Sequence, residues 1–98
     1  MSKEEIVITD NEFLRQFETH INNELATIEY SQQDRKIFLT KLLMPDGTED
    51  RQEDFIVAVL NEIKERNTRV VPTSPEIAGF IRKNRRKYKD LLPVGINI

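Results

Sequence analysis

The sequence predicts one α+β domain, with a mainly antiparallel, twisted sheet of about five or six strands and two main helices. Apolar side chains alternate with polar ones through most of the first 45 residues, which is the two-residue period of strands with one exposed face. From Phe55 the apolar period becomes that of a helix, and a short β-branched run follows it. A chain of 98 residues has the usual size of one domain, so we expect a single domain over residues 1–98.

The first half of the chain should form the antiparallel part of the sheet. The expected strands are a first one that includes Ile6 and Ile8, followed by residues 14–21, 25–30 and 37–44. Asn22 and Asn23 predict a tight hairpin turn, because Asn tolerates the left-handed backbone that such turns require. The polar residues 32–34 predict the next turn. Residues 37–44 become apolar enough toward their end for a strand that is covered on both faces.

The second half should contain the helices and one parallel strand. Pro45 ends the preceding strand, and Asp46-Gly47 predicts a turn. A helical apolar period indicates a helix over residues 52–66, which Asn67 should end. Its expected buried stripe is Phe55, Ile56, Val59, Leu60 and Ile63. A strand over residues 68–72 should follow and run parallel to the strand before Pro45, because a strand, helix, strand order needs a crossover.

A second helix is expected over residues 75–90. Ser74 before Pro75 fits an N-cap followed by proline at the first helical position. Thr73 with Glu76 three residues later fits a capping box instead. Both registers begin the same helix. Its expected inner stripe is Ile77, Phe80, Ile81, Asn84 and Tyr88.

Composition excludes several classes of protein and of site. The chain has no cysteine, which excludes disulfides, thiol catalysis and Cys-ligated zinc, and favours a reducing, cytoplasmic location. No apolar run approaches the roughly 20 residues that cross a bilayer, and residues 1–10 lack the apolar core of a signal peptide. No spacing of metal ligands is present, so we expect no metal site. A net charge of -2 argues against a nucleic-acid binder.

Five segments, in their order along the chain, resemble landmarks of one known family. They are Leu25–Tyr30, Met44-Pro45, Phe55–Ile63, Val70–Pro75 and Tyr88–Leu91. Together with the expected order of elements, they resemble the small, single-domain GCN5-related N-acetyltransferases over residues 13–92. The resemblance implies the GNAT fold, acetyl-CoA as the acyl donor and an amine of unknown identity as the acceptor.

The resemblance also implies where acetyl-CoA would bind. Backbone groups at the end of the strand that finishes at Met44 would face the pantetheine arm, where this strand splays from the strand of Val70 and Val71. The start of the first helix would receive the pyrophosphate, because free N–H groups and the helix dipole form an anion site there. The residues assigned in this way to cofactor binding are Leu43, Met44, Thr48, Asp50, Arg51 and Ser74.

The pyrophosphate loop departs from the family pattern. Thr48 and Asp50 stand where the family has glycines, and the loop is shorter than the family's. Acidic residues crowd this helix start, with Arg51 as the only base among them: Asp46, Glu49, Asp50, Glu53 and Asp54. Like charge opposes a bound diphosphate. Carboxylates in a first turn also stabilise or cap a helix, which is the structural alternative for these acids.

Three side chains are candidates for a catalytic role. Ser74 falls at the position of the family's cysteine, and its alternative role is the helix cap. Tyr88 is a candidate general acid toward the departing thiolate, and its helical spacing also fits a tyrosine at the edge of the core. His20, the only histidine, has no carboxylate or nucleophile at a telling spacing, so we expect a surface or half-buried structural role.

Positive charge gathers near the C-terminus. Residues 1–66 carry 15 acids and 8 bases, whereas residues 67–98 carry 2 acids and 7 bases. Six of these bases lie in the segment Arg82–Lys89. The segment fits a solvated helix end, a contact for the 3′-phosphate of CoA, or a surface for an acidic protein partner or nucleic acid. Tyr88 is the only aromatic residue within it, which argues against sequence-specific recognition of nucleic acid. Two functions therefore stay open: an N-acetyltransferase, and a catalytically inactive relative that uses this segment as an interaction module.

Overall fold

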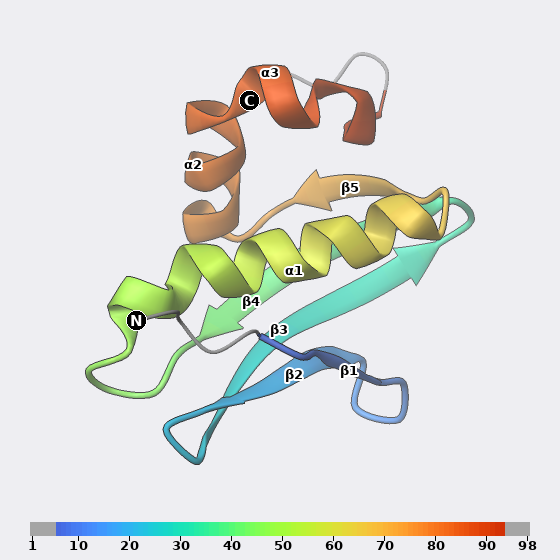
Figure 1. Cartoon of the computed structure of the whole chain (residues 1–98). Helices are drawn as coiled ribbons and strands as arrows, with labels where there is room; N and C mark the ends of the chain where they lie inside the picture. Colours follow the sequence, from blue (N-terminus) through green and yellow to red (C-terminus); the bar gives the residue numbers. More distant parts are fainter. Residues whose placement is uncertain (1–5, 94–98) are drawn as a thin grey trace.

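The computed structural model describes residues 6–93, which form a five-stranded sheet with helices packed against it (Figure 1). The strands are β1 (Thr9–Asn11), β2 (Gln16–Ile21), β3 (Glu24–Gln33), β4 (Lys36–Leu43) and β5 (Arg69–Pro72). The helices are the 3₁₀ turn η1 (Glu49–Arg51), α1 (Gln52–Glu65), α2 (Pro75–Lys83), α3 (Arg85–Tyr88) and the 3₁₀ turn η2 (Lys89–Leu91). Strands β1 to β4 pair antiparallel in chain order, and β5 pairs parallel to β4 after the α1 crossover. The expected fold class is confirmed.

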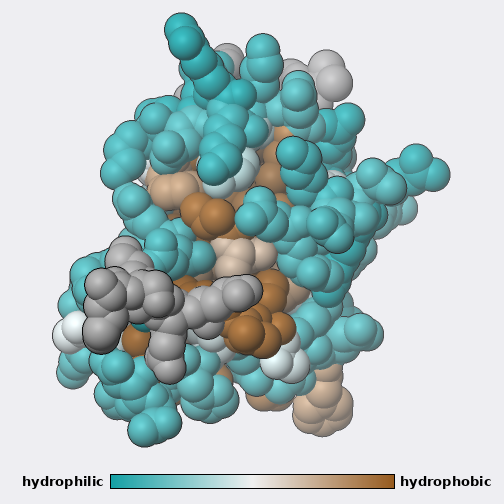
Figure 2. All heavy atoms as spheres, in the orientation of Figure 1, coloured by the Kyte–Doolittle hydropathy of each residue, from teal (hydrophilic) through white to brown (hydrophobic). Residues whose placement is uncertain are grey.

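One face of the sheet carries the core. Phe17, Ile28 and Leu39 lie on this face and are fully buried in one apolar cluster with side chains of α1, α2 and α3. We call it the helix face, because α1 lies across it (Figure 1). On the opposite, open face, side chains are exposed or half-buried apart from Thr27, which is 6% exposed. Figure 2 shows mostly hydrophilic side chains on the visible surface, with a few apolar patches between them.

A β-bulge in β4 shifts the alternation of its side chains. Tyr30 pairs with Leu39 but Glu29 pairs with Lys41, so Thr40 is an extra residue on β4. The bulge lets Leu42 return to the buried side, while Lys41 is exposed and Leu43 is 47% exposed. The expectation that this strand end is covered on both faces was wrong, since no helix formed by residues 6–93 packs on the open face there.

The turns follow the residues that favour a positive φ. Asn22 and Asn23 have φ of 54° and 67°, as a two-residue hairpin of the I′ kind requires. Asp34 has φ of 54° in the β3–β4 turn, and Asn67, with φ of 56°, follows the end of α1. The predicted positions of the Asn22-Asn23 turn and of the helix end are confirmed. The β3–β4 turn lies at residues 34–35, later than the predicted 32–34, because Gln32 and Gln33 pair with Ile37 and Lys36 and extend β3.

Strand bounds differ from expectation at the N-terminal edge. Ile6 and Ile8 precede β1 and belong to no strand, although both pack half-buried against the core. Residues 14 and 15 lie in the β1–β2 turn, and β2 begins only at Gln16. Apolar alternation shows which side chains pack inward. It does not show whether the backbone finds a hydrogen-bonding partner, so it placed both strand starts too early.

The expected helix over residues 75–90 is divided at Asn84. Asn84 has φ of -118° and ψ of 38°, and its side-chain amide donates to the carbonyl of Phe80 at 2.9 Å. A short amide side chain competes with the helix in this way for backbone partners. The chain restarts as α3 in a new direction (Figure 1), which brings Tyr88 back onto the ring of Phe80, with the ring centroids 5.8 Å apart.

Candidate functional site

Strands β4 and β5 separate at a defined point. Their parallel pairing ends where Leu39 lies beside Pro72. The backbone N–H groups of Thr73 and Ser74 then donate to the carbonyl of Leu39, at 3.0 and 2.9 Å, and the Thr73 hydroxyl donates to the same oxygen at 3.1 Å. These bonds turn the chain out of the sheet and into α2, so β5 cannot follow β4 any further.

Strand β4 continues past this point with one edge open. Thr40, Lys41, Leu42 and Leu43 pair with β3 on one side, or bulge there, and within residues 6–93 no strand pairs with their other side. Backbone N–H and C=O groups on such an edge can bind an extended ligand. Met44, just beyond the strand, is half-buried against the core. The structure therefore brings Leu43 and Met44 to the open strand end that the resemblance implies.

The start of α1 lies next to this strand end, because α1 follows β4 after a short connection. Gly47 makes the turn, with φ of 79°. Thr48 is 2% exposed, and its hydroxyl donates to the carbonyl of Pro45 at 2.6 Å. Thr48 therefore holds the loop together from inside and presents no hydroxyl to a ligand in this conformation.

Two of the five acidic residues at this helix start, Glu53 and Asp54, are engaged in ion pairs. Arg51 donates to Asp54 at 3.1 Å, and Lys83 at the end of α2 donates to Glu53 at 2.8 Å. The residues at the two N-cap positions, Thr48 and Arg51, make no capping hydrogen bond with their side chains. No carboxylate occupies an N-cap position, so none caps the helix from there. Glu53 and Asp54 lie in the first turn of α1, where a carboxylate stabilises a helix through its dipole, and each also takes part in an ion pair.

This helix start does not fit a diphosphate. Glu49 and Asp50 are exposed in η1, where the phosphates would approach. Arg51, the only base in that stretch, already pairs with Asp54, and its side chain is 17% exposed. Negative charge at this position opposes two phosphates and offsets the helix dipole that would attract them.

Ser74 has the role of a helix cap. It is fully buried, accepts a long hydrogen bond of 3.5 Å from the Ile77 N–H, and donates to the Glu76 carboxylate at 2.9 Å. Its backbone conformation is extended, with ψ of 129°, and Pro75 follows at the first helical position. The cap interpretation is confirmed, with Ser74 and not Thr73 as the capping residue. A catalytic role for the Ser74 hydroxyl stays a prediction. Because Ser74 is fully buried, its hydroxyl could reach a reactant only if the first turn of α2 opened.

Tyr88 lies at the other end of α2 from Ser74. It is 5% exposed, and its hydroxyl has no hydrogen-bond partner among residues 6–93. Burial raises the pKa of the Tyr88 phenol, so this group stays protonated at neutral pH. A protonated phenol suits a general acid, and the burial suits a core residue, so its catalytic role also stays a prediction.

The remaining sequence candidates lie elsewhere. His20 is exposed on the open face of the sheet, where it pairs with Leu25 on β3. Among residues 6–93 no group of acidic or histidine side chains is arranged to hold a metal ion. No described helix is both long and apolar enough to span a membrane.

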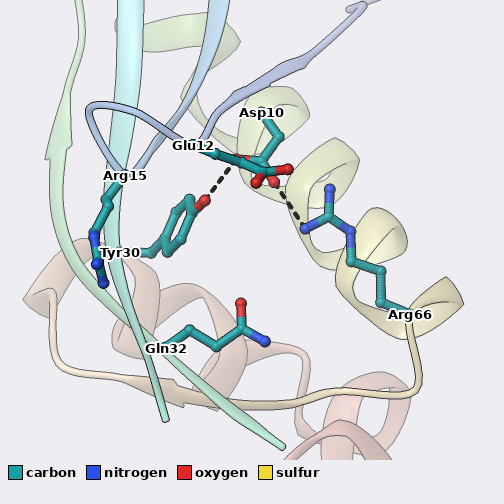
Figure 3. Close-up of a pocket in the computed structure, with 6 residues that line it drawn as sticks. All are labelled: Asp10, Glu12, Arg15, Tyr30, Gln32 and Arg66. Carbon is teal, nitrogen blue, oxygen red and sulfur yellow. Dashed lines mark hydrogen bonds and ion pairs between the residues drawn. The ribbon is translucent and has the colours of Figure 1, made fainter. Parts of the chain in front are cut away.

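The structure also contains a cavity that was not predicted from the sequence. It lies between the β1–β2 turn, β3 and the end of α1, and we call it the turn pocket (Figure 3). The residues that line it are Asp10, Glu12, Arg15, Tyr30, Gln32 and Arg66. The Tyr30 hydroxyl donates to Asp10 at 2.6 Å, and Arg66 donates to the other oxygen of the same carboxylate at 2.9 Å. Because the partners are 20 and 56 residues apart, no local spacing could have found them.

Burial and the bond to Asp10 set the state of Tyr30. Partial burial is the largest cause, followed by the hydrogen bond to Asp10 and the negative charge of that carboxylate, and together they raise the pKa of Tyr30 from 10.0 to about 12. Arg66 opposes this only weakly. Tyr30 is therefore a fixed donor to Asp10 at every physiological pH.

Comparisons with known proteins agree with this geometry. The NMR solution structure of a GCN5-like putative N-acetyltransferase from Staphylococcus aureus matches with a TM-score of 0.63 and 20% sequence identity. The match covers 97% of this chain and 94% of that chain, and at this identity it shows the fold. No curated protein matches the sequence. A family model for the GCN5-related N-acetyl-transferases matches residues 16–91. The chain therefore belongs to the GCN5-related N-acetyltransferase family.

Proposed function

We propose that this domain is an N-acetyltransferase that takes its acetyl group from acetyl-CoA and holds this donor mainly by the pantetheine arm. The observation that carries the proposal is the separation of β4 from β5 after Leu39, which leaves the edge of Thr40–Leu43 open. An extended, amide-containing arm can pair with such an edge as a further strand would.

The chain needs to supply little beyond position. The donor brings a thioester; attack by a neutral amine forms the C–N bond and breaks the C–S bond, and the thiolate leaves with the proton released by the amine. Backbone N–H groups on the β4 edge would orient the carbonyl and stabilise its negative charge. Side chains at the start of α1 would contribute no attraction to the phosphates, so we expect weak donor binding.

The test compares two donors that differ in their phosphates. S-acetylpantetheine lacks the diphosphate and the nucleotide, so it should bind about as tightly as acetyl-CoA, within roughly threefold. Amide chemical shifts should move along residues 40–44 with both ligands, and not along residues 48–54. If acetyl-CoA bound far more tightly and the shifts centred on residues 48–54, the start of α1 would be a functional phosphate site. The proposal that the donor is held mainly by its pantetheine arm would then fail.

A variant of the helix start tests the same point from the protein side. Glu49→Gln with Asp50→Gly removes two charges and restores one glycine. At low salt it should bind acetyl-CoA about three- to tenfold more tightly than the parent, and the gain should shrink as salt screens the charges. Glu24→Gln with Glu65→Gln makes the same change of net charge elsewhere and should leave affinity unchanged. Equally weak binding by parent and variant would assign the loss to the short loop instead of its charge.

A second candidate function is an interaction module without catalysis. It rests on the acids at the helix start and on the exposure of all six bases in the C-terminal segment: Arg82, Lys83, Arg85, Arg86, Lys87 and Lys89. Such a surface fits an acidic protein partner. Two results together would favour this function over the first. The domain should bind polyglutamate and lose that binding when Arg82→Gln, Arg85→Gln and Arg86→Gln are combined, and its amide chemical shifts should not change when either acetyl donor is added.

A further inference from the structure

We propose that the turn pocket binds a short zwitterionic peptide, with its ammonium group toward Glu12 and Asp10 and its carboxylate toward Arg15. The pocket has a volume of about 300 Å³ and opens to solvent beside the β1–β2 turn. Ligand pockets begin at roughly this size. Every side chain that lines it is polar, with two acids and two arginines, so its formal charge is zero and its ligand should carry both signs.

The inner wall of the pocket is held by its own bonds. Asp10 accepts from Tyr30 at 2.6 Å and from Arg66 at 2.9 Å. Arg66 also donates to Glu62 at 2.8 Å, and its guanidinium lies 5.5 Å from the ring centroid of Phe17. A wall fixed by this network loses little freedom when a ligand binds.

The outer groups are free to bind. Within residues 6–93, the side chains of Glu12, Arg15 and Gln32 make no hydrogen bond or ion pair. The backbone of Arg15 is held in the turn, because its carbonyl accepts from the backbone N–H of Tyr30 at 2.9 Å. Figure 3 shows Glu12 on the Asp10 side of Tyr30, Arg15 on the opposite side, and the Gln32 amide below the Tyr30 ring, turned toward the Arg66 side of the pocket.

This arrangement selects the length and chemistry of the ligand. The cation-binding and anion-binding groups lie on opposite sides of the Tyr30 side chain, so the two charges of the ligand must be separated. An extended dipeptide spans about 7 Å between its ends and carries one amide for Gln32. A carboxylate also matches the planar fork of an arginine.

The pocket is separate from the proposed donor site. It lies at the C-terminal end of α1, whereas the donor site adjoins the start of that helix, and a helix of 14 residues is about 21 Å long. The inference therefore does not depend on acetyl-CoA binding, and either one can fail alone.

Three probes on the unaltered protein test the proposal. Alanylalanine should shift the amide resonances of residues 12–15 and 30–32. N-acetyl-alanylalanine lacks the ammonium group and alanylalanine amide lacks the carboxylate, so each should bind about tenfold more weakly, as expected for one lost charge-assisted contact. Equal binding of the three probes, or no shift at these residues with alanylalanine at tens of millimolar, would overturn the proposal.

Two variants assign the ends of the ligand. Glu12→Gln should weaken the binding of alanylalanine about tenfold but leave the binding of N-acetyl-alanylalanine unchanged. Arg15→Gln should likewise weaken the binding of alanylalanine about tenfold but leave the binding of alanylalanine amide unchanged. Both positions are exposed, and Glu24→Gln and Arg86→Gln are exposed controls outside the pocket that should change nothing. If both pocket variants bound all probes like the parent, the shifts would reflect contact elsewhere on the protein. In that case the pocket would not be the site.

Discussion

The two tyrosines show how the same hydroxyl acquires opposite roles from its surroundings. Tyr30 is half-buried and donates to Asp10, which in turn is held by Arg66. Tyr88 is more deeply buried, and its hydroxyl finds no partner among residues 6–93. A buried hydroxyl without a partner loses its hydration and gains nothing, so only the hydroxyl of Tyr30 should contribute to stability.

Tyr30→Phe should lower the free energy of unfolding by about 1–2 kcal/mol, because it removes a hydrogen bond to a carboxylate. Tyr88→Phe is the matched control and should be neutral or slightly stabilising, since its ring and its contact with Phe80 remain. Urea unfolding of both variants measures this difference. An equal loss in both would show that Tyr88 has a bonding partner after all.

Alkaline pH should remove the contribution of Tyr30. Its pKa is raised to about 12 in the folded state, so its stabilisation is complete below pH 10.0, the unfolded value, and is lost as pH rises through about 12. The advantage of the parent over Tyr30→Phe should shrink by about 1–2 kcal/mol over that window, after allowance for solvent screening at this half-buried group. Urea unfolding of the two proteins at pH 9 and pH 11.5 compares them. A constant difference would contradict the raised pKa.

At the scale of elements, the start of α2 ends the pairing of β5 with β4 and so leaves the β4 edge of the candidate donor site open. Ser74 caps the helix with its side chain, while its backbone N–H donates to Leu39 across the gap. One residue therefore serves the helix and the strand separation together. The local sequence Ser74-Pro75 explains the cap, and the position of Leu39 explains where the sheet opens.

Ser74→Ala should lower the free energy of unfolding by about 1–2 kcal/mol, because it removes a cap and leaves a buried N–H unpaired. Ser31→Ala, at an exposed position on β3, should change stability by less than about 0.5 kcal/mol. If Ser74 is a cap and not a catalytic group, any acetyl transfer measured with the folded variant should keep its kcat. A collapse of kcat with stability intact would restore the catalytic role.

At the scale of the whole molecule, Arg66 ties the first strand to the end of α1. Its ion pair with Asp10 joins positions 56 residues apart, and Asp10 lies on β1, the strand at the edge of the sheet. β1 has only three residues, so its backbone pairing alone holds it weakly. The tie at Arg66 should therefore decide how often this edge opens.

Arg66→Gln should raise the amide hydrogen-exchange rates of residues 9–11 by about fivefold or more and leave those of β3 and β4 nearly unchanged. The global loss should be about 1 kcal/mol, since the pair is partly exposed. Lys83→Gln breaks the more exposed pair with Glu53 and should leave exchange in β1 as it was. Uniform acceleration across the sheet would mean that β1 opens only with the whole domain.

Features that depend only on neighbouring residues could be predicted from the sequence of this protein. Alternation, the helical stripe from Phe55 to Ile63 and the turn residues Asn22 and Asn23 located the elements, because strand and helix periods and left-handed turns are local properties. The same local reading identified the acidic helix start and the Ser74 cap. It could not place Asn84, where the helix breaks, because a single Asn permits both continuation and a break.

The residues that form each candidate site come from distant segments, so their grouping became visible in the folded structure. The carbonyl of Leu39 becomes the point of strand separation because Thr73 and Ser74, more than 30 residues later, donate to it. The turn pocket exists because the network from Asp10 to Tyr30 and Arg66 closes contacts between distant segments. Exposure of the β4 end was predicted wrongly for the same reason, since its apolar sequence indicated burial on both faces whereas Leu43 is 47% exposed. Such features depend on how elements pack, and the free energy of packing is distributed over residues that no local pattern connects.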